Sequence, residues 1–188
     1  MRRQDQLSWH VVPASDRLKQ NRFQNRVPNV LFLSKRNSLR SQLAEATLRK
    51  VGGSTFKAYS CGVPVHISPD VSPVAVATLQ KAGISTEGLY PKSWSEFAKF
   101  GPSKMDYVIA LDEALAHLHP AWPGQPEVAL WNYPDIDQEK APLELQLPQT
   151  TKMLLSMQYR LELLVGLCAK VRGRREMRDD LRDLGRSY

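Results

Sequence analysis

Short runs rich in apolar residues alternate with amphipathic stretches along the middle of the chain. Four runs have the length and composition of strands buried on both faces of a parallel sheet, at residues 30–33, 56–60, 105–111 and 128–131. Apolar positions spaced three and four apart predict helices, at residues 41–48, 72–81 and 154–168. Because strands and helices alternate, we expect an α/β fold with a four-stranded parallel open sheet and helices on both of its faces.

The ends of the chain differ in composition from its middle. Residues 1–27 are polar with little apolar periodicity, and they predict a basic N-terminal arm. Residues 28–170 contain every predicted strand and form the expected domain. Residues 171–188 form a charged C-terminal tail, which either prolongs the last helix beyond Gly173 or frays in solvent.

The positive charge is concentrated toward these two end segments. Lysine and arginine number 26 against 19 aspartate and glutamate, which gives a formal net charge of +7. Basic ends can contact nucleic acid or a membrane surface, but here they lack regular aromatic interleaving. No apolar run approaches the length of a transmembrane helix. We therefore expect neither a nucleic-acid partner nor a membrane.

Cysteine and histidine supply no evident metal site or disulfide framework. Cys61 and Cys168 are the two cysteines of the chain, and their spacing is unlike that of metal ligands or a CxxC pair. His117 and His119 lack a third ligand at a fitting spacing. We therefore expect no metal and no cofactor, and a chain with so few cysteines predicts a reducing, cytoplasmic location.

A polar loop follows the first predicted strand and precedes the first predicted helix. In a parallel sheet this is the carboxyl edge, where α/β folds place their ligands. Successive backbone amides of such a loop, together with the positive end of the helix, suit a tetrahedral oxyanion. Arg40 has the planar fork that binds such an anion bidentately. The residues predicted to bind the anion are Ser34, Lys35, Arg36, Asn37, Ser38, Leu39, Arg40 and Ser41.

Residues 30–46 carry a family resemblance, since they read VLFLSKRNSLRSQLAEA. This run resembles the phosphate loop and first helix of low-molecular-weight tyrosine phosphatases, and especially of their bacterial arsenate reductase relatives. Five later blocks resemble arsenate reductases in the same order, at residues 58–62, 92–97, 105–109, 120–124 and 130–135. The resemblance spans roughly residues 29–168 and implies a flavodoxin-like, phosphotyrosine phosphatase I fold.

The resemblance also assigns catalytic positions, and one of them has changed. Ser34 stands at the place of the nucleophilic cysteine, Arg40 at that of the anion-binding arginine, and Asp135 at that of the general acid. Asp137 is a fallback acid, and Asp112 is a weaker candidate. In the family a loop thiolate attacks phosphorus or arsenic. Serine ionises far less readily and has no neighbouring base in the motif, so we predict oxyanion binding without normal catalysis.

Thioredoxin-coupled arsenate reductases need two further cysteines, and both are missing here. Leu111 or Asp112 stands near the first place, and His119 occupies the second. A disulfide relay cannot be assembled from this chain, so arsenate reduction by that route is excluded. Cys61 stands where small residues such as alanine are common in the family, which favours a buried structural thiol over a replacement nucleophile.

Three functions stay open. The leading hypothesis is a pseudo-phosphatase that binds phosphate, sulfate, arsenate or a phosphotyrosine protein without turning it over. The second is a genuine low-molecular-weight tyrosine phosphatase in which Ser34 is an engineered change from cysteine. The third is a non-catalytic interaction scaffold. Lys35 and Arg36 either strengthen anion binding or point into solvent.

Overall fold

Four parallel strands form the sheet of the computed structural model, which describes residues 26–99, 104–136, 142–168 and 174–186. The strands are β1 (Asn29–Leu33), β2 (Lys57–Cys61), β3 (Tyr107–Ala110) and β4 (Glu127–Leu130). Their order across the sheet is β2-β1-β3-β4. Leu33 of β1 pairs with Cys61 of β2 and with Ala110 of β3. The four-stranded parallel sheet predicted from the sequence is confirmed.

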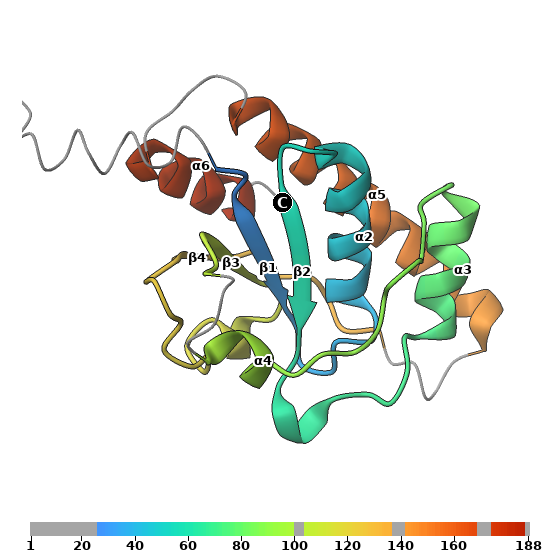
Figure 1. The fold of residues 1–188 in the computed structure, drawn as a ribbon. Coiled ribbons are helices and arrows are strands. Elements are labelled where there is room, and N and C mark those ends of the chain that lie inside the picture. Colours follow the sequence, from blue (N-terminus) through green and yellow to red (C-terminus); the bar gives the residue numbers. More distant parts are fainter. Residues whose placement is uncertain (1–25, 100–103, 137–141, 169–173, 187–188) are drawn as a thin grey trace, which may run out of the picture.

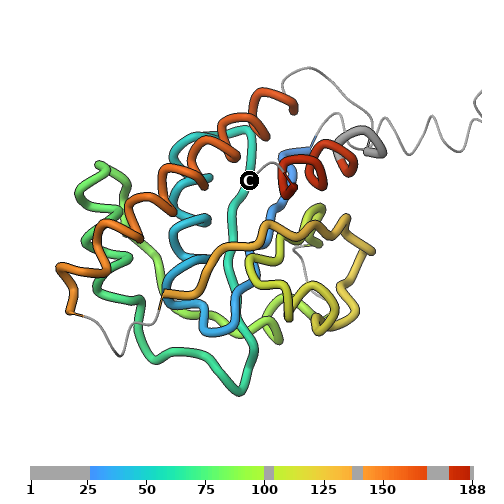
Figure 2. Tube along the Cα trace, turned by 180° about the vertical axis from the view of Figure 1, so that it is seen from behind, coloured from blue at the N-terminus to red at the C-terminus, as the bar shows by residue number. Residues whose placement is uncertain are grey.

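Helices cover the sheet, and Figures 1 and 2 show their arrangement from opposite sides. The longer helices are α2 (Arg40–Gly52), α3 (Pro73–Lys81), α5 (Leu143–Cys168) and α6 (Arg174–Arg186). The short ones are α4 (Ser95–Ala98) and the 3-10 turns η1 (Pro64–His66) and η2 (Glu113–Leu115). In Figure 1, α5 runs behind α2 toward α3, and α4 lies below the sheet, near its carboxyl edge.

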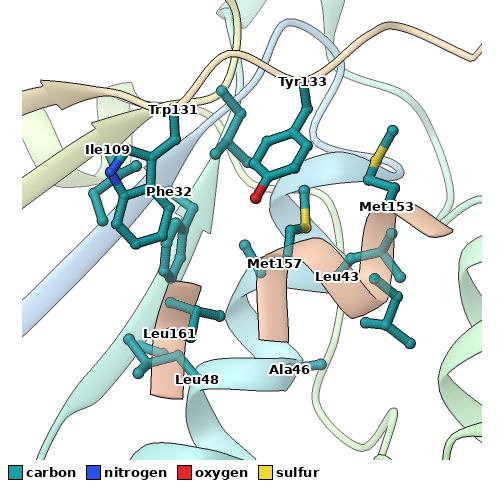
Figure 3. Packing of buried hydrophobic residues seen from close by; sticks show 14 of the residues in the cluster. Phe32, Leu43, Ala46, Leu48, Ile109, Trp131, Tyr133, Met153, Met157 and Leu161 are labelled. Atoms are coloured by element: carbon teal, nitrogen blue, oxygen red, sulfur yellow. The ribbon is translucent and has the colours of Figure 1, made fainter. Parts of the chain in front are cut away.

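Alternate residues of β1 enter two separate apolar clusters. Val30 and Phe32 face the cluster that α2 and α5 complete, whereas Leu31 and Leu33 face a second cluster that contains Trp122. This alternation follows from the two-residue period of a strand. Figure 3 shows Phe32 and its neighbours in the larger cluster packed against side chains of α2 and α5. Both faces of β1 are therefore buried, which fixes the strand that leads into the loop.

Helix α5 is longer than the predicted helix over residues 154–168. Its predicted apolar stripe is buried at Leu154, Met157, Leu161 and Leu164. The helix begins eleven residues earlier, at Leu143, and includes Pro148. Among the described residues, no helix is both long enough and apolar enough to span a membrane.

Helix α6 packs against β4 and α5. The Nε1–H of Trp131 donates a hydrogen bond to the carbonyl of Leu181 (2.9 Å), and the Leu181 side chain is buried in the larger cluster. Gly185 lies so close to the sheet that a Cβ there would stand 2.1 Å from the Leu130 carbonyl oxygen. The described part of the charged C-terminal segment therefore contributes to the core.

Candidate functional site

The loop between β1 and α2 is held by backbone hydrogen bonds to the end of β2 and to the segment that follows it. Its first residue, Ser34, donates its backbone N–H to the carbonyl of Cys61 (3.1 Å). Three loop carbonyls accept backbone amides, namely Lys35 from Val63 (3.0 Å), Arg36 from Ser68 (3.0 Å) and Ser38 from Ser72 (2.9 Å). These bonds turn the loop carbonyls outward and fix the loop at the carboxyl edge of the sheet.

The amides on the inner side of the loop have no acceptor among the described residues. Residues 37–40 are all buried. Their backbone N–H groups donate to no acceptor in the part of the chain that the structure describes. Buried amides normally have a partner, and consecutive amides without one form a concave anion site. The loop therefore has the concave form of an anion site, which agrees with the prediction made from the sequence without testing it. We call the inner face formed by residues 34–41 the cradle.

Asn37 sets the curvature of the cradle from its centre. Its backbone adopts φ 51°, a left-handed conformation that asparagine tolerates better than most residues. Its side-chain amide donates to Ser41 Oγ (2.7 Å) and to Ser60 Oγ (2.8 Å). Its carbonyl Oδ1 accepts the backbone N–H of Lys92 (2.6 Å). Three bonds to three separate segments therefore hold the turn that points the amides inward.

Ser34 lies at the floor of the cradle and is 3% exposed. Its Oγ is 2.7 Å from the Oγ of Ser41. Ser41 Oγ also accepts a hydrogen bond from the Asn37 side-chain amide. Either hydroxyl can be the donor in the bond between Ser34 and Ser41. The Ser34 Oγ has no carboxylate or imidazole partner among the described residues.

Arg40 reaches from the start of α2 to the ends of β3 and β4. Its Nη1 donates to the carbonyls of Tyr133 (2.9 Å) and Leu111 (3.3 Å). Its Nη2 lies 3.1 Å from Asp112 Oδ2 and 3.3 Å from Asp135 Oδ1. The guanidinium is 5% exposed. The carbonyls therefore fix the orientation of the fork, and the two carboxylates neutralise its charge.

The two carboxylates at Arg40 have different freedom. Asp112 is 23% exposed, and its Oδ1 accepts the Ala114 amide (3.1 Å) at the start of η2, so both of its oxygens are engaged. Asp135 is 61% exposed and contacts Arg40 through one oxygen. Of the acids considered from the sequence, Asp112 is the fixed partner of the arginine and Asp135 is the accessible one. Asp137 lies outside the described residues.

A buried ionic cluster lies behind the cradle and was not singled out from the sequence. Glu45 of α2 is 1% exposed and lies 3.1 Å from the Nζ of Lys92, which is 5% exposed. Ser60 donates its hydroxyl to Glu45, and Arg49 pairs with the other carboxylate oxygen. Since Ser60 also accepts from Asn37, the cluster is connected to the cradle through one hydroxyl. No local pattern in the sequence indicates it, because Glu45 and Lys92 are 47 positions apart.

The segment after β4 that contains Tyr133 packs against the larger apolar cluster. The Tyr133 side chain is 5% exposed, and Figure 3 shows its ring directed toward Met157 of α5. Burial raises the pKa of the Tyr133 hydroxyl, and the Arg160 guanidinium, 4.9 Å from the ring centroid, partly offsets this. The backbone carbonyl that binds Arg40 is thereby fixed by the core.

The two cysteines lie outside the cradle. Cys61 is buried at the end of β2, and this burial raises the pKa of its thiol. Burial also raises the pKa of Cys168 to about 12. Both are therefore protonated thiols at neutral pH, and neither replaces the nucleophile. Within the described residues, no group of three or more His, Cys, Asp or Glu side chains could hold a metal ion.

The predicted anion-binding residues divide into a cradle and a rim. Ser34 and residues 37–41 are buried. The Leu39 side chain belongs to the core, so only its amide can serve an anion. Lys35 and Arg36 are exposed. We call the open edge of the cradle, to which they belong, its mouth. Anion binding by these residues stays a prediction. The buried residues are placed to contact an anion inside the cradle, and the two exposed ones are not.

Gly62→Ala is expected to distort the cradle from outside. A Cβ at this position would lie 3.0 Å from the Asn37 backbone nitrogen and 2.9 Å from Ile67 Cδ1. Such overpacking costs about 1–3 kcal/mol, and the affected nitrogen is one of the cradle amides. We expect lower stability in urea unfolding and weaker phosphate binding in calorimetric titration.

Gly166→Ala is the matched control, because a Cβ there meets nothing within 4 Å. If Gly62→Ala binds phosphate with unchanged affinity, the prediction is contradicted.

The fold and the loop are shared with a known protein family. The family model for low molecular weight phosphotyrosine protein phosphatases matches residues 29–133. This match covers more than half of the 188 residues, so the chain belongs to this family.

Curated relatives are arsenate reductases. The glutaredoxin arsenate reductase of Synechocystis sp. is 32% identical over 108 residues, which cover 57% of this chain and 78% of the relative. The arsenate reductase of Halalkalibacterium halodurans is 30% identical over 106 residues, which cover 56% of this chain and 72% of the relative.

Solved structures show the same fold. An arsenate reductase in the phosphate-binding state has a TM-score of 0.58 at 29% identity, covering 77% of this chain and 99% of that one. The tyrosine phosphatase Wzb from Escherichia coli, in complex with sulphate, has a TM-score of 0.57 at 17% identity, covering 73% and 97%. At that lower identity the likeness to Wzb concerns the fold alone.

Proposed function

We propose that this chain is a pseudo-phosphatase, which binds a phosphate-type oxyanion in the Ser34–Ser41 loop and does not turn it over. The observation that carries the proposal is the intact cradle with a hydroxyl at its floor. Residues 37–40 are buried and their amides have no acceptor in the described part of the chain, and the buried hydroxyl at the start of the loop is that of Ser34.

The charge and shape of the cradle support a tetrahedral dianion. Amides bind the oxygens that point into the loop, and the Arg40 fork binds the oxygens that point out. To use that fork, the anion replaces Asp135 at Nη2, which is feasible because Asp135 is 61% exposed. Phosphate, sulfate and arsenate share the required geometry. A phosphorylated side chain presents the same three oxygens.

The surroundings of Ser34 support the absence of turnover. Nucleophilic serines require a base that takes the hydroxyl proton, and Ser34 Oγ is hydrogen-bonded to the hydroxyl of Ser41 instead. The chain contains two cysteines, and neither lies in the cradle. A thiol-based reduction of arsenate at this site would therefore lack the cysteine that attacks arsenic.

The test is a calorimetric titration of the chain with phosphate, arsenate and phosphotyrosine, with assays of aryl-phosphate hydrolysis. We expect saturable binding and no hydrolysis. Ser34→Cys is expected to bind phosphate at least about tenfold more weakly, because a thiolate at the floor repels a dianion a few ångströms away. No saturable binding by any of the three ligands would refute the proposal.

A second candidate function, a phosphatase that needs only its cysteine, is favoured by the position of Asp135. Its exposed carboxylate lies 3.3 Å from Arg40 Nη2, beside the cradle. With cysteine at position 34, the thiolate would attack phosphorus, the ester oxygen would leave with a proton from Asp135, and water would then hydrolyse the thiophosphate. Rapid hydrolysis by Ser34→Cys that is lost in Ser34→Cys/Asp135→Asn would support this candidate.

A further inference from the structure

Two exposed cations border the cradle without contributing to its inner face. Lys35 and Arg36 are exposed, whereas residues 37–40 are buried. Their carbonyls accept the amides of Val63 and Ser68, each at 3.0 Å. These bonds fix the backbone of both residues against the segment that follows β2. The backbone of both residues therefore lies on the β2 side of the cradle, and both side chains are exposed.

The opposite side of the mouth is acidic. Asp112 follows β3 and Asp135 follows the end of β4. The order β2-β1-β3-β4 places these two strands across β1 from β2. Both carboxylates contact Arg40. The mouth is therefore polarised across the sheet, with cations on one side and carboxylates on the other.

A lone phosphate ion does not make full use of this mouth. The cradle amides and Arg40 account for its oxygens, and the exposed cations lie outside that inner shell. A ligand uses them when it carries a second negative group close to the first. An acidic residue next to a phosphorylated residue supplies such a group. Val65 of η1 is 83% exposed on the same side and offers apolar contact to a peptide.

We propose that the mouth recognises a phosphorylated protein segment whose acidic flanking residues lie over Lys35 and Arg36, on the β2 side. This inference rests on the proposed oxyanion function and adds the class of ligand. Exposed ion pairs contribute modestly and are screened by salt. The acidic flank therefore raises affinity by about three- to tenfold at low ionic strength, and by less in high salt.

The experiment measures binding of fluorescent phosphotyrosine peptides to the full chain by anisotropy. The peptides have equal length and carry glutamate, glutamine or lysine before or after the phosphotyrosine. We expect glutamate peptides to bind most tightly and lysine peptides least. In Lys35→Ala and Arg36→Ala the glutamate advantage shrinks, and the affinity for inorganic phosphate changes less. Lys57→Ala is the matched control, because it removes the same charge from the exposed amino end of β2.

The outcomes separate this inference from the function on which it rests. If inorganic phosphate does not bind the intact chain, oxyanion binding itself fails. If phosphate binds but the peptides show no order by flanking charge, the recognition of acidic segments is overturned and oxyanion binding stands. An equal loss of the glutamate advantage in Lys57→Ala also overturns it, because net charge would then explain the preference.

Discussion

Arg40→Ala is expected to weaken phosphate binding by at least about 100-fold, the largest effect of any single change at the site. A charge-assisted hydrogen bond contributes about 1.5–3 kcal/mol, and an anion that replaces Asp135 gains such a bond from Nη2 of Arg40. The remaining amides keep their geometry but lose the buried positive charge of the Arg40 guanidinium. Calorimetric titration with phosphate measures the effect.

Two further variants control for a loss of folding at Arg40. The guanidinium also binds the carbonyls of Leu111 and Tyr133, so thermal unfolding is measured on the same samples. Arg40→Lys keeps the charge without the fork and is expected to bind with intermediate affinity. Asp135→Asn removes a competing charge from Arg40 and is expected to bind phosphate as tightly as the unsubstituted chain or more tightly. Wild-type affinity in Arg40→Ala would contradict the assigned role.

Lys92→Met is expected to lower the free energy of unfolding by about 3–5 kcal/mol, because it leaves the Glu45 carboxylate buried without its buried cation. Glu45 is 1% exposed and Lys92 is 5% exposed, so water cannot replace the lost partner. Ser60 and Arg49 remain near the carboxylate and limit the loss. Equilibrium unfolding in urea measures the change.

The control for Lys92→Met is a substitution of Arg49, the exposed cation that pairs with the same carboxylate, Glu45. Arg49 is 41% exposed, and Arg49→Gln is expected to cost about 1 kcal/mol or less. The double variant Glu45→Leu/Lys92→Met removes both charges and is expected to be more stable than Lys92→Met alone. If Lys92→Met and Arg49→Gln cost the same, burial of the Glu45–Lys92 pair does not determine its contribution.

The sheet could be predicted because its signals are local. Each strand is a short apolar run, and the predicted 30–33 and 128–131 lie within one residue of β1 and β4 at either end. The predicted 105–111 was too long, since β3 covers Tyr107–Ala110. Helix α5 was predicted too short, because the helix continues N-terminally through Pro148, where a proline indicates a helix boundary.

The loop could be predicted and the cluster behind it could not, for one physical reason. Residues 34–41 are contiguous, so their spacing is visible in the sequence. Lys92 and Glu45 are 47 positions apart, and Arg40 and Asp112 are 72 apart. Nothing local indicates such pairings, which depend on strand order. The burial of Leu181 in α6 was missed because the surrounding charges mask a short apolar stripe.

Helix α6 links the end of the chain to the acidic side of the mouth. It holds Trp131 through the Leu181 carbonyl, and its Gly185 lies against Leu130. Two residues beyond Trp131 comes Tyr133, whose carbonyl orients Arg40, and two beyond that comes Asp135. A displacement of α6 would therefore be transmitted along five residues to the guanidinium. Helix α6 therefore packs against the strand end that positions Arg40, although it lies outside the segment that the family model matches.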